Sequence, residues 1–111
     1  MLMSKKGEMM NKRILSTIKV LKEKLQDDGF IIDGIFGSYA RSEENKNSDL
    51  DILYHLDENF YEKYRGFIGF KKLDEIKALI SEKTETKIDL APKNNLSKTA
   101  QKYILSEVIY V

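Results

Sequence analysis

Two carboxylates one residue apart, Asp49 and Asp51, open a short apolar stretch that continues to Leu56. If this stretch is a β-strand, its period of two places both carboxylates on one face, with Cβ atoms roughly 6–7 Å apart. Two such anions repel each other, and a divalent cation between them removes that cost. Because Mg2+ prefers carboxylate, phosphate and water oxygens, the pair predicts a magnesium site. Taken alone, an Asp-x-Asp pair also fits a solvated loop edge.

A third carboxylate, Asp89, lies between Ile88 and Leu90 in another short apolar stretch. An aspartate among buried residues needs a compensating partner. Metal binding, or activation of an attacking hydroxyl, would provide one, and we expect Asp89 to complete the site. A surface position on an edge strand is the alternative.

Gly37 and Ser38 lie where an apolar stretch meets an expected helical turn. Glycine lets the backbone approach a phosphate closely, and N–H groups at the start of a helical turn favour anions. The Ser38 hydroxyl can donate to a phosphate oxygen, and Arg41 can neutralise phosphate charge. Alone, these residues also fit an ordinary turn and a surface charge. Together with the three aspartates they indicate phosphoryl or nucleotidyl transfer.

The elements that must position these residues follow from the hydrophobic pattern. We expect helices over residues 9–28, 70–82 and 97–105, with Ser97 as the N-cap of the last. We expect strands over residues 30–36, 49–56 and 86–91, and a final edge strand over 108–111. Residues 39–42 are expected to form a helical turn, residues 43–48 a polar loop, and residues 57–68 show no clean period. The order predicts an α/β (α+β) fold, a small mixed β-sheet flanked by helices. The apolar residues expected on the buried side of the 70–82 helix are Phe70, Leu73, Ile76 and Ile80, with Lys77 beside them.

Length and composition narrow the class of protein. The 111 residues suggest one domain over 1–111, with residues 1–8 loosely ordered. The absence of cysteine excludes disulfides and thiolate metal sites. His55 is the only histidine, and we interpret it as a surface or packing residue. No apolar run approaches the roughly 20 residues that cross a bilayer, and no secretory signal is visible, so we expect a cytoplasmic protein without membrane contact. The net charge of +1 disfavours direct nucleic-acid binding.

The motifs resemble those of a known family. The run Gly37-Ser38-Tyr39-Ala40-Arg41, followed by Ser48-Asp49-Leu50-Asp51, looks like the signature of the polymerase-β-like nucleotidyltransferase superfamily. Ten residues separate Ser38 from Asp49, as in its minimal nucleotidyltransferases (MNT proteins), and Lys87-Ile88-Asp89-Leu90 is similar to their third-carboxylate strand. The resemblance covers about residues 12–111. One departure is Ser42, where the family often has glycine.

The resemblance implies a fold, a chemistry and a partner. Asp49 and Asp51 would bind Mg2+, Asp89 would complete the metal site and help to activate the acceptor, and Gly37 and Ser38 would hold the triphosphate. Many members are antitoxins paired with a HEPN ribonuclease toxin, and active ones are similar to adenylyltransferases that move AMP from ATP to a tyrosine of that toxin. We therefore expect a protein adenylyltransferase with ATP as substrate.

Two other functions stay open from the sequence. One is an antitoxin that neutralises its toxin by binding alone, and the other is a nucleotidyltransferase for a small molecule. With little length for an acceptor domain, we expect another protein to present the acceptor. The aromatic segment 60–67 is a candidate for that contact, and packing in the core is its alternative.

Overall fold

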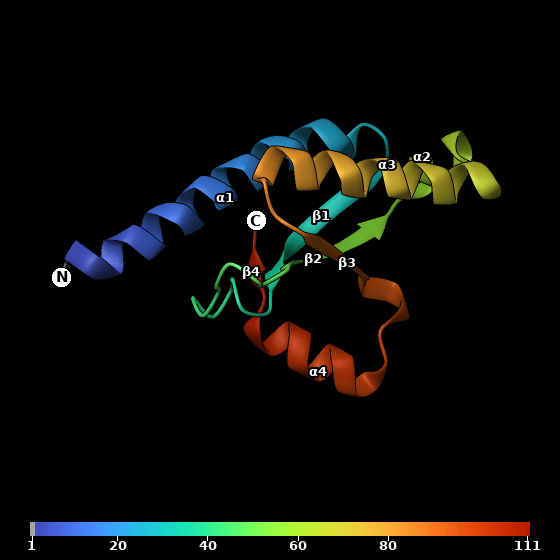
Figure 1. The fold of residues 1–111 in the computed structure, drawn as a ribbon. Helices are drawn as coiled ribbons and strands as arrows, with labels where there is room; N and C mark the ends of the chain where they lie inside the picture. Colours follow the sequence, from blue (N-terminus) through green and yellow to red (C-terminus); the bar gives the residue numbers. More distant parts are fainter. Residues whose placement is uncertain (1) are drawn as a thin grey trace.

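A small mixed sheet with helices on both faces forms the body of the molecule (Figure 1). The computed structural model of the chain describes the backbone of residues 2–111 and the side chains from Lys12 onward. Its elements, in chain order, are α1 (Leu2–Gln26), β1 (Phe30–Phe36), β2 (Leu50–Leu56), α2 (Glu58–Lys63), α3 (Phe67–Thr84), β3 (Ile88–Pro92), the 3-10 turn η1 (Lys93–Asn95), α4 (Lys98–Glu107) and β4 (Ile109–Tyr110).

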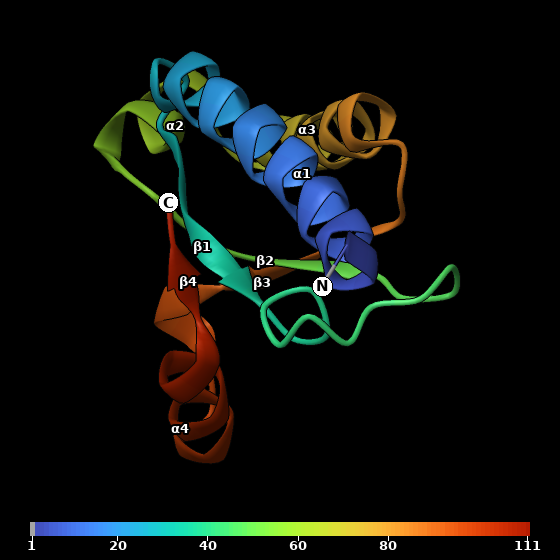
Figure 2. The same cartoon turned by 90° about the vertical axis from the view of Figure 1, so that its left-hand side faces the viewer.

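The sheet has four strands in the order β3-β2-β1-β4. β1 pairs antiparallel with β2 and with β4, whereas β2 and β3 are parallel because α2 and α3 carry the chain back between them. Figure 2 shows α1 and α3 on one face of the sheet and α4 on the other. The mixed α+β architecture and the small sheet confirm the fold expected from the sequence.

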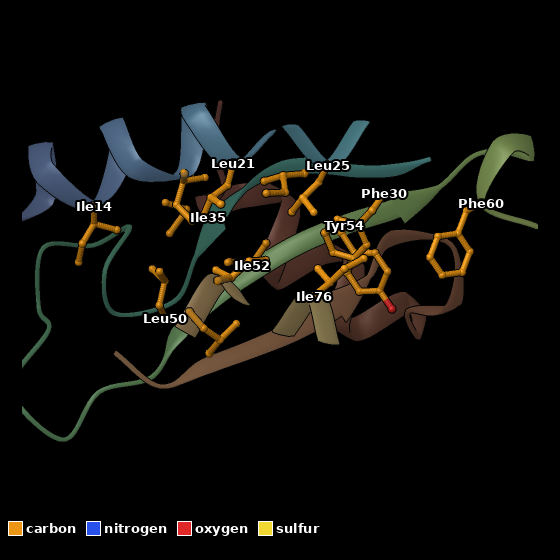
Figure 3. Packing of buried hydrophobic residues seen from close by; sticks show 14 residues of the cluster. Ile14, Leu21, Leu25, Phe30, Ile35, Leu50, Ile52, Tyr54, Phe60 and Ile76 are labelled. Carbon is orange, nitrogen blue, oxygen red and sulfur yellow. The ribbon is translucent and has the colours of Figure 1, made fainter. Parts of the chain in front are cut away.

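The main core lies between the sheet and the pair α1 and α3 (Figure 3). The apolar stripe of α1 is fully buried against it, as the helical spacing predicted. Strand side chains of β1 and β2 reach the same core from below, and Phe30 stacks on Tyr54 with ring centroids 4.7 Å apart. Leu53, also fully buried, points to the opposite face because strand side chains alternate. There α4 covers the sheet, and Ile104 is its buried residue.

A β-bulge at Asp33 changes which face of the sheet the later side chains of β1 point to. The register with β2 shifts between Ile32 and Gly34, so Asp33 is the extra residue. Without this shift, Ile35 would point away from Ile32; with it, both are buried in the same core. The bulged Asp33 pairs with His55, whose Nδ1 lies 2.8 Å from a carboxylate oxygen. This contact lies at the far end of β2 from Asp51, which agrees with a packing role for His55.

The strand predictions match the structure more closely than the helix predictions. Residues 57–68, which show no clean period, contain α2, whose N-cap Asp57 accepts hydrogen bonds from the N–H groups of Asn59 and Phe60. The prediction that Phe70 is buried is wrong, because its side chain is 71% exposed while Ile76 and Ile80 turn inward. The last helix begins after the N-cap Ser97, as expected, and runs on to Glu107.

The first helix begins at Leu2, earlier than the expected start at residue 9. Met1 lies outside the described residues, and the loose order expected of residues 1–8 stays a prediction. Within residues 2–111, no helix combines the length and the apolar character needed to cross a membrane.

Candidate active site

The loop after β1 folds directly over the carboxylate of Asp51. Gly37 has a positive φ of 76°, and a Cβ added there would lie 2.0 Å from Oδ2 of Asp51. Only glycine allows this close approach, because any side chain would collide with the carboxylate. The structure therefore brings the polypeptide backbone at Gly37 against Asp51 of the Asp-x-Asp pair.

The expected helical turn over residues 39–42 is a compact turn without a helix. The Arg41 N–H donates to the Gly37 carbonyl at 3.1 Å, and the Glu43 N–H donates to the Ser38 carbonyl at 2.8 Å. Ser42 adopts a positive φ of 58°. That is the left-handed region in which glycine carries no strain, and it lies at the position where the family resemblance implied glycine.

The parallel pairing of β2 with β3 brings Asp51 and Asp89 together. Asp51 lies opposite Asp89 in the register, so the two side chains share a face of the sheet. Asp49 lies one residue before β2, where it lines a pocket together with Lys77 and Ser81 of α3. Asp51 is partly buried, whereas Asp49 and Asp89 are exposed.

The carboxylate of Asp51 is both partly buried and repelled by neighbouring carboxylates. Burial first, and then the charges of Asp89, Asp49 and Glu107, raise the pKa of Asp51 to about 6, while Arg41 acts in the opposite direction. The side-chain carboxylate of Asp51 accepts no hydrogen bond from the residues that the structure describes, so no donor offsets its charge. A nearby cation strongly stabilises the ionised form of such a carboxylate.

The chemistry of the three aspartates suits a hard divalent cation, because carboxylate oxygens are its preferred ligands. As the side chains stand, the described part of the chain holds no three acidic or histidine groups gathered closely enough to share an ion. Asp49 and Asp89 are exposed, and their side chains would have to turn toward Asp51 to share an ion with it.

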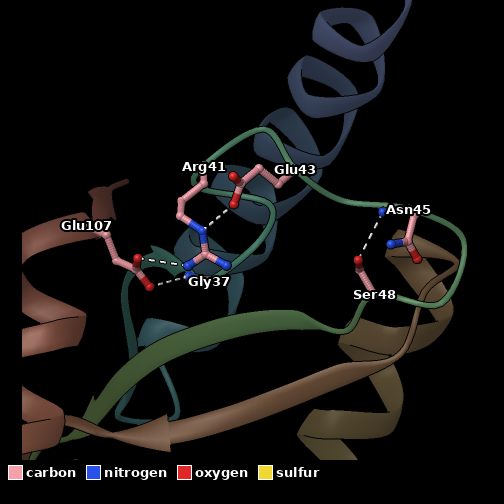
Figure 4. Close-up of polar contacts among 6 residues, drawn as sticks. All are labelled: Gly37, Arg41, Glu43, Asn45, Ser48 and Glu107. Carbon is pink, nitrogen blue, oxygen red and sulfur yellow. Dashed lines mark hydrogen bonds and ion pairs between the residues drawn. The ribbon is translucent and has the colours of Figure 1, made fainter.

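Arg41 and the Gly37 N–H share an acceptor that the sequence did not indicate. Oε1 of Glu107 accepts the Gly37 N–H at 3.0 Å, and Oε2 accepts Nη1 of Arg41 at 2.9 Å (Figure 4). The Nε of Arg41 also donates to Glu43 at 2.6 Å. Glu107 is the last residue of α4, so only the fold brings it to the loop; no local motif marks it.

Ser38 is partly buried in the same loop, and its hydroxyl forms no hydrogen bond with any described residue. It remains available to donate to a ligand. Every residue predicted for the site thus lies on the β1–β2 loop, on β2 or on β3. Gly37 and Asp51 are in direct contact range, and Asp51 and Asp89 are register partners.

The matched family decides which kind of domain this is. A sequence model described as a nucleotidyltransferase domain matches residues 14–111 of the chain. The chain belongs to the nucleotidyltransferase domain family. All six predicted site residues lie inside the matched range.

Relatives with names support the nucleotidyltransferase assignment. The chain is 35% identical over 79 residues to protein adenylyltransferase MntA of Thermococcus cleftensis, covering 70% of this chain and 71% of the relative. It is 37% identical over 94 residues to a Methanocaldococcus jannaschii protein named "Putative protein adenylyltransferase", covering 84% and 85%.

Two solved structures share the nucleotidyltransferase fold. One, described as a "putative minimal nucleotidyltransferase", superposes with a TM-score of 0.65 at 21% identity and covers 95% of both chains. The other is a chain from a toxin-antitoxin crystal structure with AMP-PNP, with a TM-score of 0.59 at 17% identity, covering 90% of this chain and 70% of that one. At these identities the likeness establishes the fold.

Proposed function

We propose that this nucleotidyltransferase domain transfers AMP from ATP to a tyrosine of a HEPN-type toxin, acting as its antitoxin in the cytoplasm. The observation that carries the proposal is the contact of the Gly37 backbone with Asp51, opposite Asp89. This contact supports the proposal that the loop binds phosphate beside carboxylates that bind Mg2+. The names of the relatives, which are protein adenylyltransferases, support AMP as the transferred group.

The proposal gives each residue of the site a task. The N–H of Gly37, the Ser38 hydroxyl and the Arg41 guanidinium hold the triphosphate. Asp49, Asp51 and Asp89 would hold Mg2+, which neutralises phosphate charge when bound. Asp89 is exposed at the outer strand β3 and can accept the proton of the incoming hydroxyl.

The reaction is an in-line displacement at the α-phosphorus. The acceptor oxygen forms a bond to the α-phosphorus as the bond to the bridging oxygen of the β-phosphate breaks. The hydroxyl proton passes to Asp89, and pyrophosphate leaves with the bonding electron pair. Arg41 and the loop N–H groups stabilise the charge that develops on the departing phosphates.

A partner contact at the α2–α3 corner is part of the proposal. Within segment 60–67, Phe60 is 2% exposed and the Tyr64 hydroxyl donates to Asp28 at 2.9 Å, so these two rings pack the protein itself. Tyr61 and Phe67 are 60% and 91% exposed. The neighbouring Ile68 and Phe70 are also exposed, and we assign these exposed apolar side chains to the contact with the toxin.

The test of this contact uses serine substitutions that cannot disturb the core. The double variant Phe67→Ser/Phe70→Ser is expected to weaken toxin binding at least tenfold in titration calorimetry, while its thermal midpoint stays close to that of wild type. Val20→Ser, an equally exposed apolar residue on α1, is the matched control. Unchanged affinity in the double variant would remove the corner from the interface.

The activity itself is tested with ATP labelled at the α-phosphate, Mg2+ and the co-expressed toxin. Label is expected on the toxin with wild type and at least a hundredfold less with Asp49→Asn/Asp51→Asn. If the complex forms but wild type transfers no label, the domain neutralises its partner by binding alone.

A further inference from the structure

The carboxylate of Glu107 sits on the loop in the manner of a phosphate group. Its two oxygens accept from two separate donors, the Gly37 N–H at 3.0 Å and Nη1 of Arg41 at 2.9 Å. A phosphate also presents two charged oxygens to a backbone N–H and a guanidinium. These two donors belong to the residues assigned to the triphosphate, so the same groups cannot serve both ligands at once.

We propose that Glu107 occupies the triphosphate cradle in the nucleotide-free protein and limits its affinity, so that an incoming nucleotide binds by displacing this carboxylate from Gly37 and Arg41. The inference rests on the proposed function, because it assumes that the loop binds a triphosphate. It adds a residue from α4 to a site otherwise built from the two central strands, their connecting loop and β3.

The surroundings of Glu107 favour a contact that can be released. It is the last residue of α4, and its side chain is 24% exposed, so rotation toward solvent does not require the helix to move. Its charge also adds to the repulsion on Asp51. The carboxylate is therefore held by two donors, and its charge repels that of Asp51.

Arg41 keeps its orientation when Glu107 leaves. Its Nε still donates to Glu43, which lies in the same loop at 2.6 Å. The guanidinium edge that faces Glu107 is then open to a phosphate oxygen. The Gly37 N–H becomes open at the same time, because both bonds end on one carboxylate.

Displacement and a supporting role of Glu107 predict opposite effects of Glu107→Gln on the affinity for triphosphate. If Glu107 competes with phosphate, Glu107→Gln binds triphosphate more tightly, because the charge is lost and the hydrogen bonds to Gly37 and Arg41 weaken. If Glu107 instead holds the loop in its binding shape, the same variant binds triphosphate more weakly.

The experiment measures binding of inorganic tripolyphosphate and of ATP by titration calorimetry at fixed Mg2+. Glu107→Gln is expected to bind both about tenfold more tightly than wild type, and Glu107→Ala at least as tightly as Glu107→Gln. Glu43→Gln is the matched control: it removes a carboxylate from Arg41 but leaves the Gly37 N–H occupied, so its gain is smaller. Equal or weaker binding by the folded Glu107 variants overturns the proposal.

A measurement on the wild-type protein guards against variants that fail to fold. Tripolyphosphate is expected to shift the side-chain carboxyl 13C resonance of Glu107 together with the Gly37 amide resonance. A shift at Gly37 alone refutes displacement. If labelled AMP is transferred but Glu107→Gln gains no affinity, only this inference fails; if no triphosphate binds to either protein, the proposed function fails with it.

Discussion

Removing the charge of Asp51 should stabilise the metal-free protein at neutral pH. The carboxylate is partly buried, is repelled by Asp89, Asp49 and Glu107, and has its pKa raised from 3.8 to about 6. A group whose pKa is higher in the folded than in the unfolded state lowers stability as pH rises between the two values. Asp51 therefore does not lower the stability of the folded protein near pH 4, and it lowers that stability fully above about pH 6.

The size of the effect follows from the pKa difference. At about 1.4 kcal/mol for each pH unit, the difference between 3.8 and about 6 corresponds to about 3 kcal/mol. We halve this figure because Asp51 is partly exposed and solvent screens the repulsion. The free energy of unfolding of Asp51→Asn is thus expected to exceed that of wild type by about 1–1.5 kcal/mol at pH 7.5. This corresponds to a rise of roughly 0.5–1 M in the urea midpoint.

The assay is urea unfolding followed by circular dichroism at pH 4 and pH 7.5, with a chelator present. The advantage of Asp51→Asn should appear at pH 7.5 and vanish at pH 4. Asp74→Asn, an exposed aspartate on α3, should show no such change. Added Mg2+ should then stabilise wild type but not Asp51→Asn, since binding to the folded state raises stability. A variant that is no more stable at pH 7.5 than wild type would refute this account of the site.

Three further substitutions test the framework. Gly37→Ala places a methyl group 2.0 Å from Oδ2 of Asp51 at a φ of 76°, so it should lose about 1–3 kcal/mol in urea unfolding and at least ten times its transfer activity; unchanged values would disprove the close approach. Asp57→Ala removes the cap that accepts the Phe60 N–H and should lower stability by about 1 kcal/mol in thermal unfolding, whereas Asp57→Asn should retain most of it. Leu53→Ala empties a fully buried position on the α4 side and should cost about 2–4 kcal/mol; a loss below about 1 kcal/mol would mean that α4 does not seal that face.

The parts of the fold that sequence patterns predicted are those governed by local rules. β1 begins and ends where its apolar run does, at Phe30 and Phe36. Ser97 caps α4 as its residue type predicted. α2 was missed because its six residues are too few to show a helical period, and its cap is an aspartate in a charged context. Phe70 was misplaced because periodicity alone does not show where a helix extends beyond the sheet it packs on.

The site was predictable where the motif is continuous in the chain. Gly37, Ser38, Asp49 and Asp51 lie in one strand–loop–strand unit, and the spacing alone places them together. The in-register partner Asp89 could be named as a candidate, but its pairing with Asp51 depends on the parallel crossover. Glu107 was not predictable, because a glutamate at a helix end has no motif and its contacts with the loop arise only from tertiary structure.

The parallel crossover also sets an order of assembly. The loop and the first two aspartates belong to β1 and β2, which pair as antiparallel neighbours close in the chain. We expect Asp89 to join them later, because its parallel pairing with β2 requires the long connection through α2 and α3 to close. β3 is moreover an outer strand of five residues, held on one side only. Local fraying of β3 would separate Asp89 from Asp51 while the rest of the sheet stays paired. On heating, transfer activity is therefore expected to be lost at a lower temperature than the fold.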